Sequence, residues 1–232
     1  MTHPTDAIPT SASADSNDGG TGRRSFLQRG LVTSAAVFAT QALALPSTAS
    51  AQNAGAQTRV NFPDIQRHEN AHVAFLVSAL AGSARPKPTF KDLLQPDRRA
   101  FFKVSQALEN TGVGAYLGAA PVIFSRQILA AAGSIALIEG RHAGWLNTLV
   151  GDRLTTNVYG EEQSFERPLT DEEVVALASP FIADLNGGPA VMYAPTPSTE
   201  NDVDILNFAL ALEYLEAEFY NLNVPVFFGQ GK

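Results

Sequence analysis

The chain has 232 residues, of which 45% are hydrophobic, and this length and composition suit one domain with a sizeable core. Its net charge of −7 argues against nucleic acid as a partner, because phosphate contacts need clustered Lys and Arg side chains. The absence of cysteine excludes disulfides, thiolate metal sites and a cysteine nucleophile, so any metal must be held by nitrogen and oxygen ligands.

Residues 1–51 have the pattern of an export signal. Arg23-Arg24 precedes an apolar stretch at 30–45, and Ala49-Ser50-Ala51 forms a small-residue cleavage pattern before Gln52. This order is typical of a twin-arginine signal peptide, and an uncleaved anchor or a disordered tail is the alternative. We therefore expect a mature protein that is periplasmic or extracellular and has no membrane span.

The first helix of the mature chain is predicted to begin at Pro63-Asp64 and to end near Leu80, after a flexible N-terminus at 52–62. Proline is tolerated in the first turn of a helix, and the helix dipole favours an acidic residue there. The apolar face of this helix is interrupted by Glu69 and His72. Because residues three apart share a helix face, both side chains can reach the same point.

Two further helices follow. One is predicted from about Pro96 to Ala120, with glycines at 112, 114 and 118 that weaken it, and it carries Glu109 on its apolar face. The next is predicted at 125–149 and repeats the Glu-x-x-His pattern with Glu139 and His142.

A long connection at 151–201 is predicted to contain a short helix at 171–178, and its length indicates that it crosses or covers the domain. The last helix is expected to begin at Asn201 or Asp202 and to reach Tyr220, with a C-terminal tail at 223–232. Four helices, no convincing alternating strands and no phosphate-binding glycine pattern predict an all-α four-helix bundle over 63–222.

Each of the four helices places a glutamate within an apolar face, and two of these glutamates are followed by histidine at i+3. A buried carboxylate is costly unless it is paired or binds a metal. Paired Glu-x-x-His helices are typical of two-metal carboxylate centres in four-helix bundles, and such a ligand set suits Fe or Mn. We therefore predict a di-iron or di-manganese site with six ligands: Glu69, His72, Glu109, Glu139, His142 and Glu213.

Structural roles for these residues remain open. Glu69 and His72 could simply pair with each other, since helix i,i+3 pairs are common. Glu109 directly precedes the part of its helix that glycines weaken, so its position on the apolar face depends on whether the helix continues there. Glu216 and Glu218 lie on the same helix as Glu213 and could face inward in its place. Glu213 is the preferred ligand, and Glu216 is the alternative.

Two tyrosines lie seven residues after a predicted ligand, Tyr116 after Glu109 and Tyr220 after Glu213. They are candidates to donate hydrogen bonds to ligating carboxylates, and packing in the core is the alternative. His68 is expected at the surface because it points away from the apolar face.

These motifs resemble the ferritin-like domain family that includes plant desiccation-related proteins and exported bacterial relatives. The similarity covers about 65–220 and rests on the segments 68–76, 109–121, 132–143 and 204–220. It implies a ferritin-like antiparallel bundle with a long crossover connection before the last helix. In relatives the helix similar to 204–220 comes first, so the chain looks circularly permuted, and a swapped dimer is the alternative.

The resulting expectation is an exported ferritin-like protein whose di-metal site reacts with oxygen or peroxide, with a redox or stress and desiccation role. Whether it is an enzyme, a di-metal oxidoreductase, is left open. The expected partners are metal ions, and a homo-oligomer is compatible with the sequence. The alternative is a metal-free stress-protective or structural bundle that binds partners.

Overall fold

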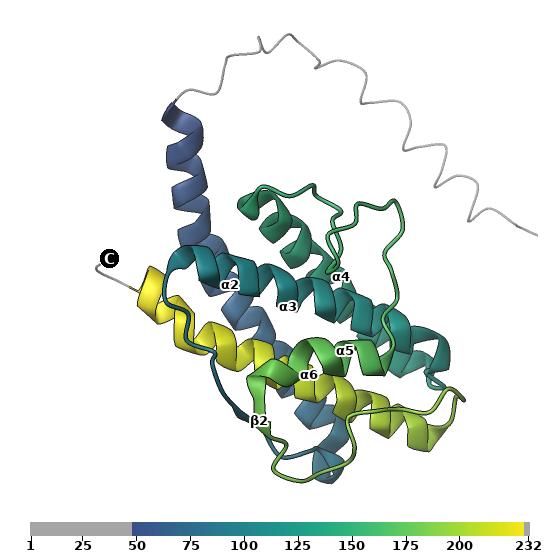
Figure 1. The fold of residues 1–232 in the computed structure, drawn as a ribbon. Helices are drawn as coiled ribbons and strands as arrows, with labels where there is room; N and C mark the ends of the chain where they lie inside the picture. Colours follow the sequence, from purple (N-terminus) through teal and green to yellow (C-terminus); the bar gives the residue numbers. More distant parts are fainter. Residues whose placement is uncertain (1–47, 230–232) are drawn as a thin grey trace, which may run out of the picture. The chain divides into compact units, whose positions relative to one another are not determined.

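The computed structural model of the protein describes residues 48–229. The predicted export signal lies outside the described residues as far as Ser47. The described part is mostly helical, as predicted for an all-α protein, and its helices are α2 (Thr48–Leu80), α3 (Arg98–Ala119), α4 (Arg126–Val150), α5 (Asp171–Ala178) and α6 (Thr199–Phe228) (Figure 1).

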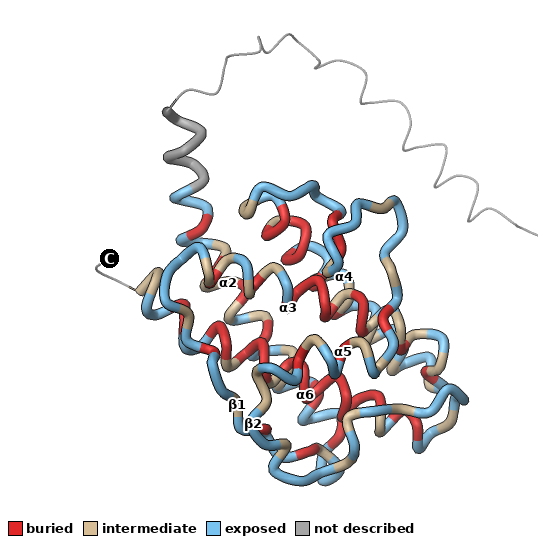
Figure 2. The backbone as a smooth tube through the Cα atoms, viewed as in Figure 1, coloured by how far each residue is buried: buried red, intermediate tan, exposed pale blue. Residues whose placement is uncertain are grey.

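The four long helices form an antiparallel bundle in which α2 and α3 run one way and α4 and α6 run the other. Phe62, in the first half of α2, contacts rings at the start of α3 and at the ends of α4 and α6, namely Phe101, Trp145 and Phe228. At the opposite end of the bundle, Leu80 of α2 packs in a cluster with Leu206 near the start of α6. Buried positions face one another between the helices (Figure 2).

Two connections must return along the length of the bundle. Residues 81–97 join the parallel helices α2 and α3, and residues 151–198 join α4 to α6, so the predicted crossover before the last helix is confirmed. The two connections also pair through β1 (Thr89–Phe90) and β2 (Ile182–Asp184), a short antiparallel sheet. In contrast, α3 and α4 are joined by a short turn that contains the 3-10 helix η2 (Ala120–Val122).

The helix boundaries follow from the capping residues. Asp97 accepts a hydrogen bond from the backbone of the first turn of α3, and Ser125 and Ser198 do the same for α4 and α6. Thr170 forms a capping box with Glu173, which gives α5 the predicted bounds. The predicted starts of α3, α4 and α5 lie close to the observed ones, whereas α6 begins at Thr199, before the predicted Asn201 or Asp202.

The prediction of a flexible segment at 52–62 is wrong, because α2 begins at Thr48 and continues through Pro63. A proline inside a helix loses one backbone hydrogen bond and costs about 3 kcal/mol. Packing offsets this cost, since Phe62 is fully buried and lies 4.7–5.2 Å, between ring centroids, from four other aromatic rings. The helical backbone on both sides of Pro63 is therefore held by tertiary contacts.

The prediction of a C-terminal tail from 223 is also wrong for the described residues, because α6 continues to Phe228 with Pro225 inside it. Asn223 is fully buried, and its side chain hydrogen-bonds to the connection 81–97. Its amide nitrogen donates to Leu93 O at 2.9 Å, and its oxygen accepts from Gln95 N at 2.9 Å.

Two glycines in α3 allow a close backbone approach. The Leu169 N–H donates to Gly114 O at 3.0 Å, and a Cβ at Gly118 would stand 1.8 Å from Leu169 O. The glycines expected to weaken this helix therefore let the connection lie directly against it. None of the described helices is both long enough and apolar enough to cross a membrane.

Candidate metal centre

Acidic and imidazole side chains from all four bundle helices meet in the interior. They are Glu69 and His72 of α2, Glu109 of α3, Glu139 and His142 of α4, and Glu213 and Glu216 of α6. Each of the five glutamates is at most 3% exposed. Isolated buried carboxylates are unfavourable, so the arrangement needs a compensating partner for its charge.

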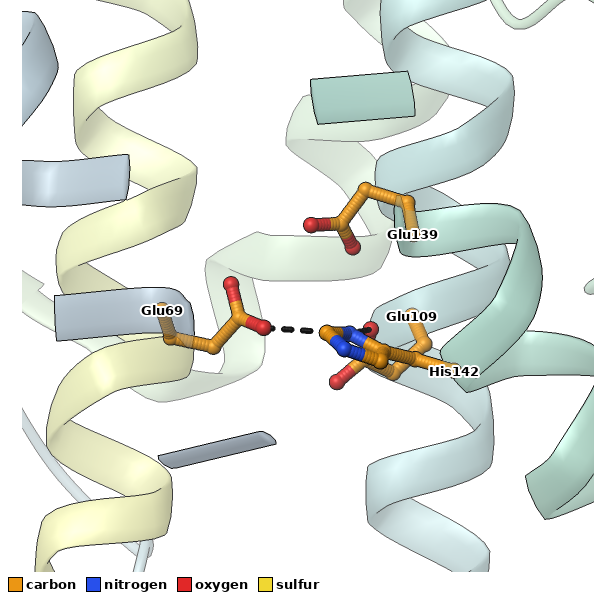
Figure 3. A group of neighbouring side chains, drawn as sticks. All are labelled: Glu69, Glu109, Glu139 and His142. Carbon is orange, nitrogen blue, oxygen red and sulfur yellow. Dashed lines mark hydrogen bonds and ion pairs between the residues drawn. The ribbon is translucent and has the colours of Figure 1, made fainter. Parts of the chain in front are cut away.

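Six of these residues form two overlapping groups, each of which offers ligand atoms within 4.8 Å of one another. One group contains Glu109 and His142, and the other contains His72 and Glu213. Glu69 and Glu139 belong to both. In the first group, the Glu69 carboxylate points toward the side chains of Glu109, Glu139 and His142 (Figure 3).

Glu69 presents one carboxylate oxygen to each histidine. Its Oε1 lies 3.1 Å from Nδ1 of His142, which also lies 2.9 Å from Oε2 of Glu109. Its Oε2 lies 2.9 Å from Nδ1 of His72. This geometry is that of a carboxylate that bridges two neighbouring positions.

His72 faces three carboxylates. Besides Glu69, its Nδ1 lies 3.2 Å from Oε1 of Glu139 and 3.3 Å from Oε2 of Glu213. The local pair of Glu69 and His72 therefore exists, but as one part of a larger cluster that includes α4 and α6.

The cluster shifts the titration of both histidines in the same direction. Burial alone would lower the pKa of His72, but hydrogen bonds to Glu213 and Glu69 and the charges of these residues raise it to about 10. Burial likewise opposes the positive charge of His142, whereas the charge and hydrogen bond of Glu109 and the hydrogen bond to Glu69 raise its pKa to about 10. Without a metal, both imidazoles are therefore protonated near neutral pH.

The pKa values of the glutamates shift in different directions. Burial favours the neutral form of Glu69, but hydrogen bonds from His142 and His72 outweigh it and lower the pKa to about 2. Burial and the charges of Glu69 and Glu109 raise the pKa of Glu139 well above its usual range. Burial also raises the pKa of Glu213, to about 7, against the hydrogen bond from His72. Glutamates at such different pKa values are typical of functional sites.

Four buried oxygens in the cluster lack a well-aligned hydrogen-bond partner among the described residues, although three of them lie 3.1–3.3 Å from a histidine Nδ1. They are Glu69 Oε1, both carboxylate oxygens of Glu139, and Glu213 Oε2. Buried polar atoms are rarely left without a partner, and the residues that carry these oxygens all belong to the two ligand groups. The donor set is carboxylate oxygen and imidazole nitrogen, so the residues present fit Fe or Mn ions.

Two tyrosines hold the outer carboxylates. The Tyr116 hydroxyl donates to Glu213 Oε1 at 2.5 Å, and the Tyr220 hydroxyl donates to Glu109 Oε1 at 2.6 Å. Each bond uses the oxygen that does not face the neighbouring histidine. Such contacts fix the orientation of a ligating carboxylate.

His68 contacts the site, although the sequence placed it at the surface. Its Nδ1 lies 2.9 Å from Nε2 of His142, and the two rings are parallel within 4°. The second nitrogen of His142 is therefore occupied, which orients the ring. The only signal in the sequence is the spacing of His68, four residues before His72 on the same helix.

Glu216, the proposed substitute for Glu213, lies outside both four-residue groups. It is nevertheless buried, and this burial together with the charges of Glu109 and Glu213 raises its pKa well above its usual range. Gly112 leaves the space between α3 and these acids open, because a Cβ there would stand 3.0 Å from Glu139 Oε2 and 3.4 Å from Glu216 Oε1.

The fold and the cluster define a four-helix-bundle protein with a carboxylate and histidine site compatible with two metal ions. The model of the ferritin-like domain matches residues 27–152 and 201–227, which is more than half of the chain. The chain therefore belongs to the ferritin-like domain family. The unmatched residues between the two segments are nearly all of the connection before α6, an arrangement consistent with a split or permuted domain. Comparisons with curated proteins and with solved structures gave no match.

Proposed function

We propose that this protein binds a pair of Fe or Mn ions, with Glu69 and Glu139 shared between them. Glu109 and His142 would complete one site, and His72 and Glu213 would complete the other. The observation that supports this assignment is the position of Glu69, whose two oxygens face different histidines at 3.1 and 2.9 Å. The overlap of the two ligand groups at Glu69 and Glu139 follows the same division.

The charge of the site supports two divalent ions. Four carboxylates carry four negative charges, which two divalent cations balance when both imidazoles are neutral. Metal binding would therefore displace the protons that the histidines hold in the metal-free protein. Tyr116 and Tyr220 would keep the outer carboxylates in place during this exchange.

We further propose that the site performs redox chemistry. Fe or Mn bound by such ligands can change oxidation state in reactions with oxygen or peroxide. The residues of the chain shield this position from bulk water, since the four shared and outer glutamates are at most 1% exposed.

The biological setting that we propose is an exported protein with a role in stress or desiccation. The support for export is the order of paired arginines, apolar stretch and small-residue pattern in residues 23–51. The support for a stress role is the resemblance to desiccation-related proteins.

The direct test is the metal content of the mature protein. We expect about two Fe or Mn ions per chain in protein isolated from its native compartment, and the loss of at least one ion in Glu69→Gln, because a bridging ligand serves both positions. Glu166→Gln, an exposed glutamate outside the bundle helices, is the matched control and should retain both ions. Wild-type protein without metal, even after incubation with Fe(II) or Mn(II), would refute the proposal.

One observation favours the metal-free alternative, namely that the histidines and glutamates already form close ion pairs. In a purely structural bundle, replacing Glu139 and His142 by Leu and Ala would leave stability unchanged or raise it, because a buried polar cluster often stabilises less than apolar packing. The same variant would lose metal binding if the di-metal proposal is correct.

A further inference from the structure

An apolar cavity of about 20 Å³ lies between the bundle helices beside the candidate centre and is partly open to solvent. All four bundle helices contribute to its wall, and the residues that line it are apolar except for Tyr116. Alanines at inward positions, among them Ala132 and Ala209, leave the space that larger side chains would fill.

The cavity is one helical turn away from three predicted ligands. Leu76 follows His72 by four residues, Ile135 precedes Glu139 by four, and Ala209 precedes Glu213 by four, and these three residues all line the cavity. Side chains four residues apart share a helix face, so wall and ligands face the same interior space.

Tyr116 is the polar boundary between cavity and centre. Its ring lines the cavity, while its hydroxyl donates to Glu213 Oε1 at 2.5 Å. On the other side, the cavity reaches Phe75, which is 46% exposed, so its wall extends from the surface of α2 to Tyr116, which donates to Glu213.

The size and lining of the cavity select its occupant. A space of about 10–15 Å³ on this measure holds one water-sized molecule, and a water needs two or more polar partners that an apolar cavity lacks. Hydrogen peroxide has the same requirement. Dioxygen is small and apolar, so it gains by leaving water for this space.

We propose that this cavity is a binding site for dioxygen, from which the gas reaches the centre past Tyr116. The binding site stands on the cavity alone, whereas its role as a source of oxidant rests on the proposed di-metal function. The cavity thus favours dioxygen over peroxide as the oxidant that the centre uses.

Xenon tests the site without any metal, because it is a small polarisable atom that binds apolar cavities. The full mature chain, freed of metal by a chelator, is titrated with xenon and followed by NMR of the xenon and of the cavity-lining methyl groups. We expect one saturable site in the wild type and at least a tenfold loss of affinity in Ala132→Leu. Ala130→Leu, on the exposed face of the same helix, should bind xenon like the wild type.

Ala132→Val serves as a second, smaller substitution if Ala132→Leu does not fold, and it should also weaken xenon binding. No saturable xenon site in the wild type, or unchanged affinity in the folded cavity variants, would overturn the binding site. Because xenon binding needs no metal, this experiment tests the binding site independently of the di-metal proposal.

The second experiment tests the role of the cavity. In Fe(II)-loaded protein, the rate of iron oxidation is measured against dissolved oxygen and, under nitrogen, against hydrogen peroxide. We expect Ala132→Leu to lower the rate constant for oxygen about tenfold at unchanged iron stoichiometry and to leave the peroxide reaction unchanged. Equal oxygen rates in wild type and variant would refute the role in oxygen delivery, and failure to bind iron would refute the di-metal function while the xenon site remains.

Discussion

Glu69 links the two halves of the candidate centre, because its carboxylate oxygens lie within ion-pair distance of Nδ1 of different histidines. The tyrosines act one step further out, since each holds one oxygen of an outer glutamate and leaves the other free to face the cluster. At this scale, the spacing of Glu-x-x-His in the sequence predicts which residues meet. It does not predict which glutamate is shared, because that depends on how far each helix lies from the others.

Tyr220→Phe should weaken metal binding more than it weakens the fold. It removes the hydrogen bond to Glu109 Oε1, and the loss of such an outer contact typically costs 10–100-fold in metal affinity. The expected loss of stability is only about 1 kcal/mol, the net value of a typical hydrogen bond. Competition titration with a chromophoric chelator measures the affinity, and chemical denaturation measures the stability.

Tyr214→Phe is the matched control, because Tyr214 lies on the same helix, packs with an apolar cluster and belongs to neither ligand group. Its metal affinity should equal that of the wild type. A Tyr220→Phe protein with wild-type affinity would show that the hydrogen bond to Glu109 has no role in binding.

Arg85 should limit the stability of the protein. It is 2% exposed, and its three guanidinium nitrogens make no hydrogen bond to the described residues. Burial lowers its pKa, the direction expected for a charge that has lost its water. Replacing buried charges by an apolar residue of similar length often stabilises a protein by about 1–4 kcal/mol, so we expect Arg85→Met to raise the free energy of unfolding.

Urea denaturation compares this variant with Arg126→Met, an exposed arginine at the start of α4 whose replacement should change stability by less than about 0.5 kcal/mol. Destabilisation by Arg85→Met would indicate that the guanidinium has a stabilising partner, such as a bound anion or ordered water.

At the scale of elements, local signals set where helices begin, and tertiary contacts set how far two of them extend. Capping residues set the starts of α3, α4, α5 and α6, and their hydrogen bonds are local enough to be predicted from sequence. The extensions of α2 and α6 through Pro63 and Pro225 depend instead on packing partners distant in the chain. A proline in the sequence predicts a helix boundary, because it lacks a backbone N–H. In α2 and α6 the helix continues instead, and the tertiary contacts of Phe62 and Asn223 stabilise it there.

Gly118→Ala should test the close contact between α3 and the long connection. The new Cβ would stand 1.8 Å from Leu169 O, so the connection must shift, and we expect a loss of more than about 2 kcal/mol from overpacking. Thermal or urea denaturation measures the change.

Gly133→Ala provides the contrast, because a Cβ there meets no atom within 4 Å in the exposed face of α4. Alanine has the higher helix propensity, so this variant should be more stable than the wild type by up to about 1 kcal/mol. Equal effects of the two substitutions would mean that helix propensity, and not the contact with Leu169, governs Gly118.

At the scale of the whole molecule, the order of the helices and their directions explain why two long connections are needed. Helix α6 packs antiparallel to α2, and the chain reaches its start only after 151–198 has returned along the bundle. The sequence predicts this crossover from the length of the connection. It does not predict that the crossover pairs with residues 81–97 through β1 and β2, since the strands have only two and three residues.

The pH dependence of the stability follows from the whole cluster, and the stabilisation by bound metal should change with pH in the opposite direction. In the metal-free protein, the pKa of His72 and His142 is raised from 6.5 to about 10, and that of Glu213 from 4.5 to about 7. Groups with raised pKa bind more protons in the folded state, so their stabilisation is complete below the unfolded value and is lost as pH rises through the folded value. Glu69, with its pKa lowered to about 2, acts in the opposite direction and only below its usual value of 4.5.

We therefore expect the melting temperature of the metal-free protein to fall as pH is raised from about 5 to 10, the window between these pKa values. In the metal-loaded protein the ions replace the protons, so the stabilisation by metal should increase over the same range. Calorimetry at several pH values, with chelator or with Mn(II), measures both slopes. Because net charge also changes with pH, the variant His72→Gln/His142→Gln is the control, and its metal-free slope should be shallower. A metal-free melting temperature that rises between pH 6 and 9 would contradict the proton-holding role of this cluster.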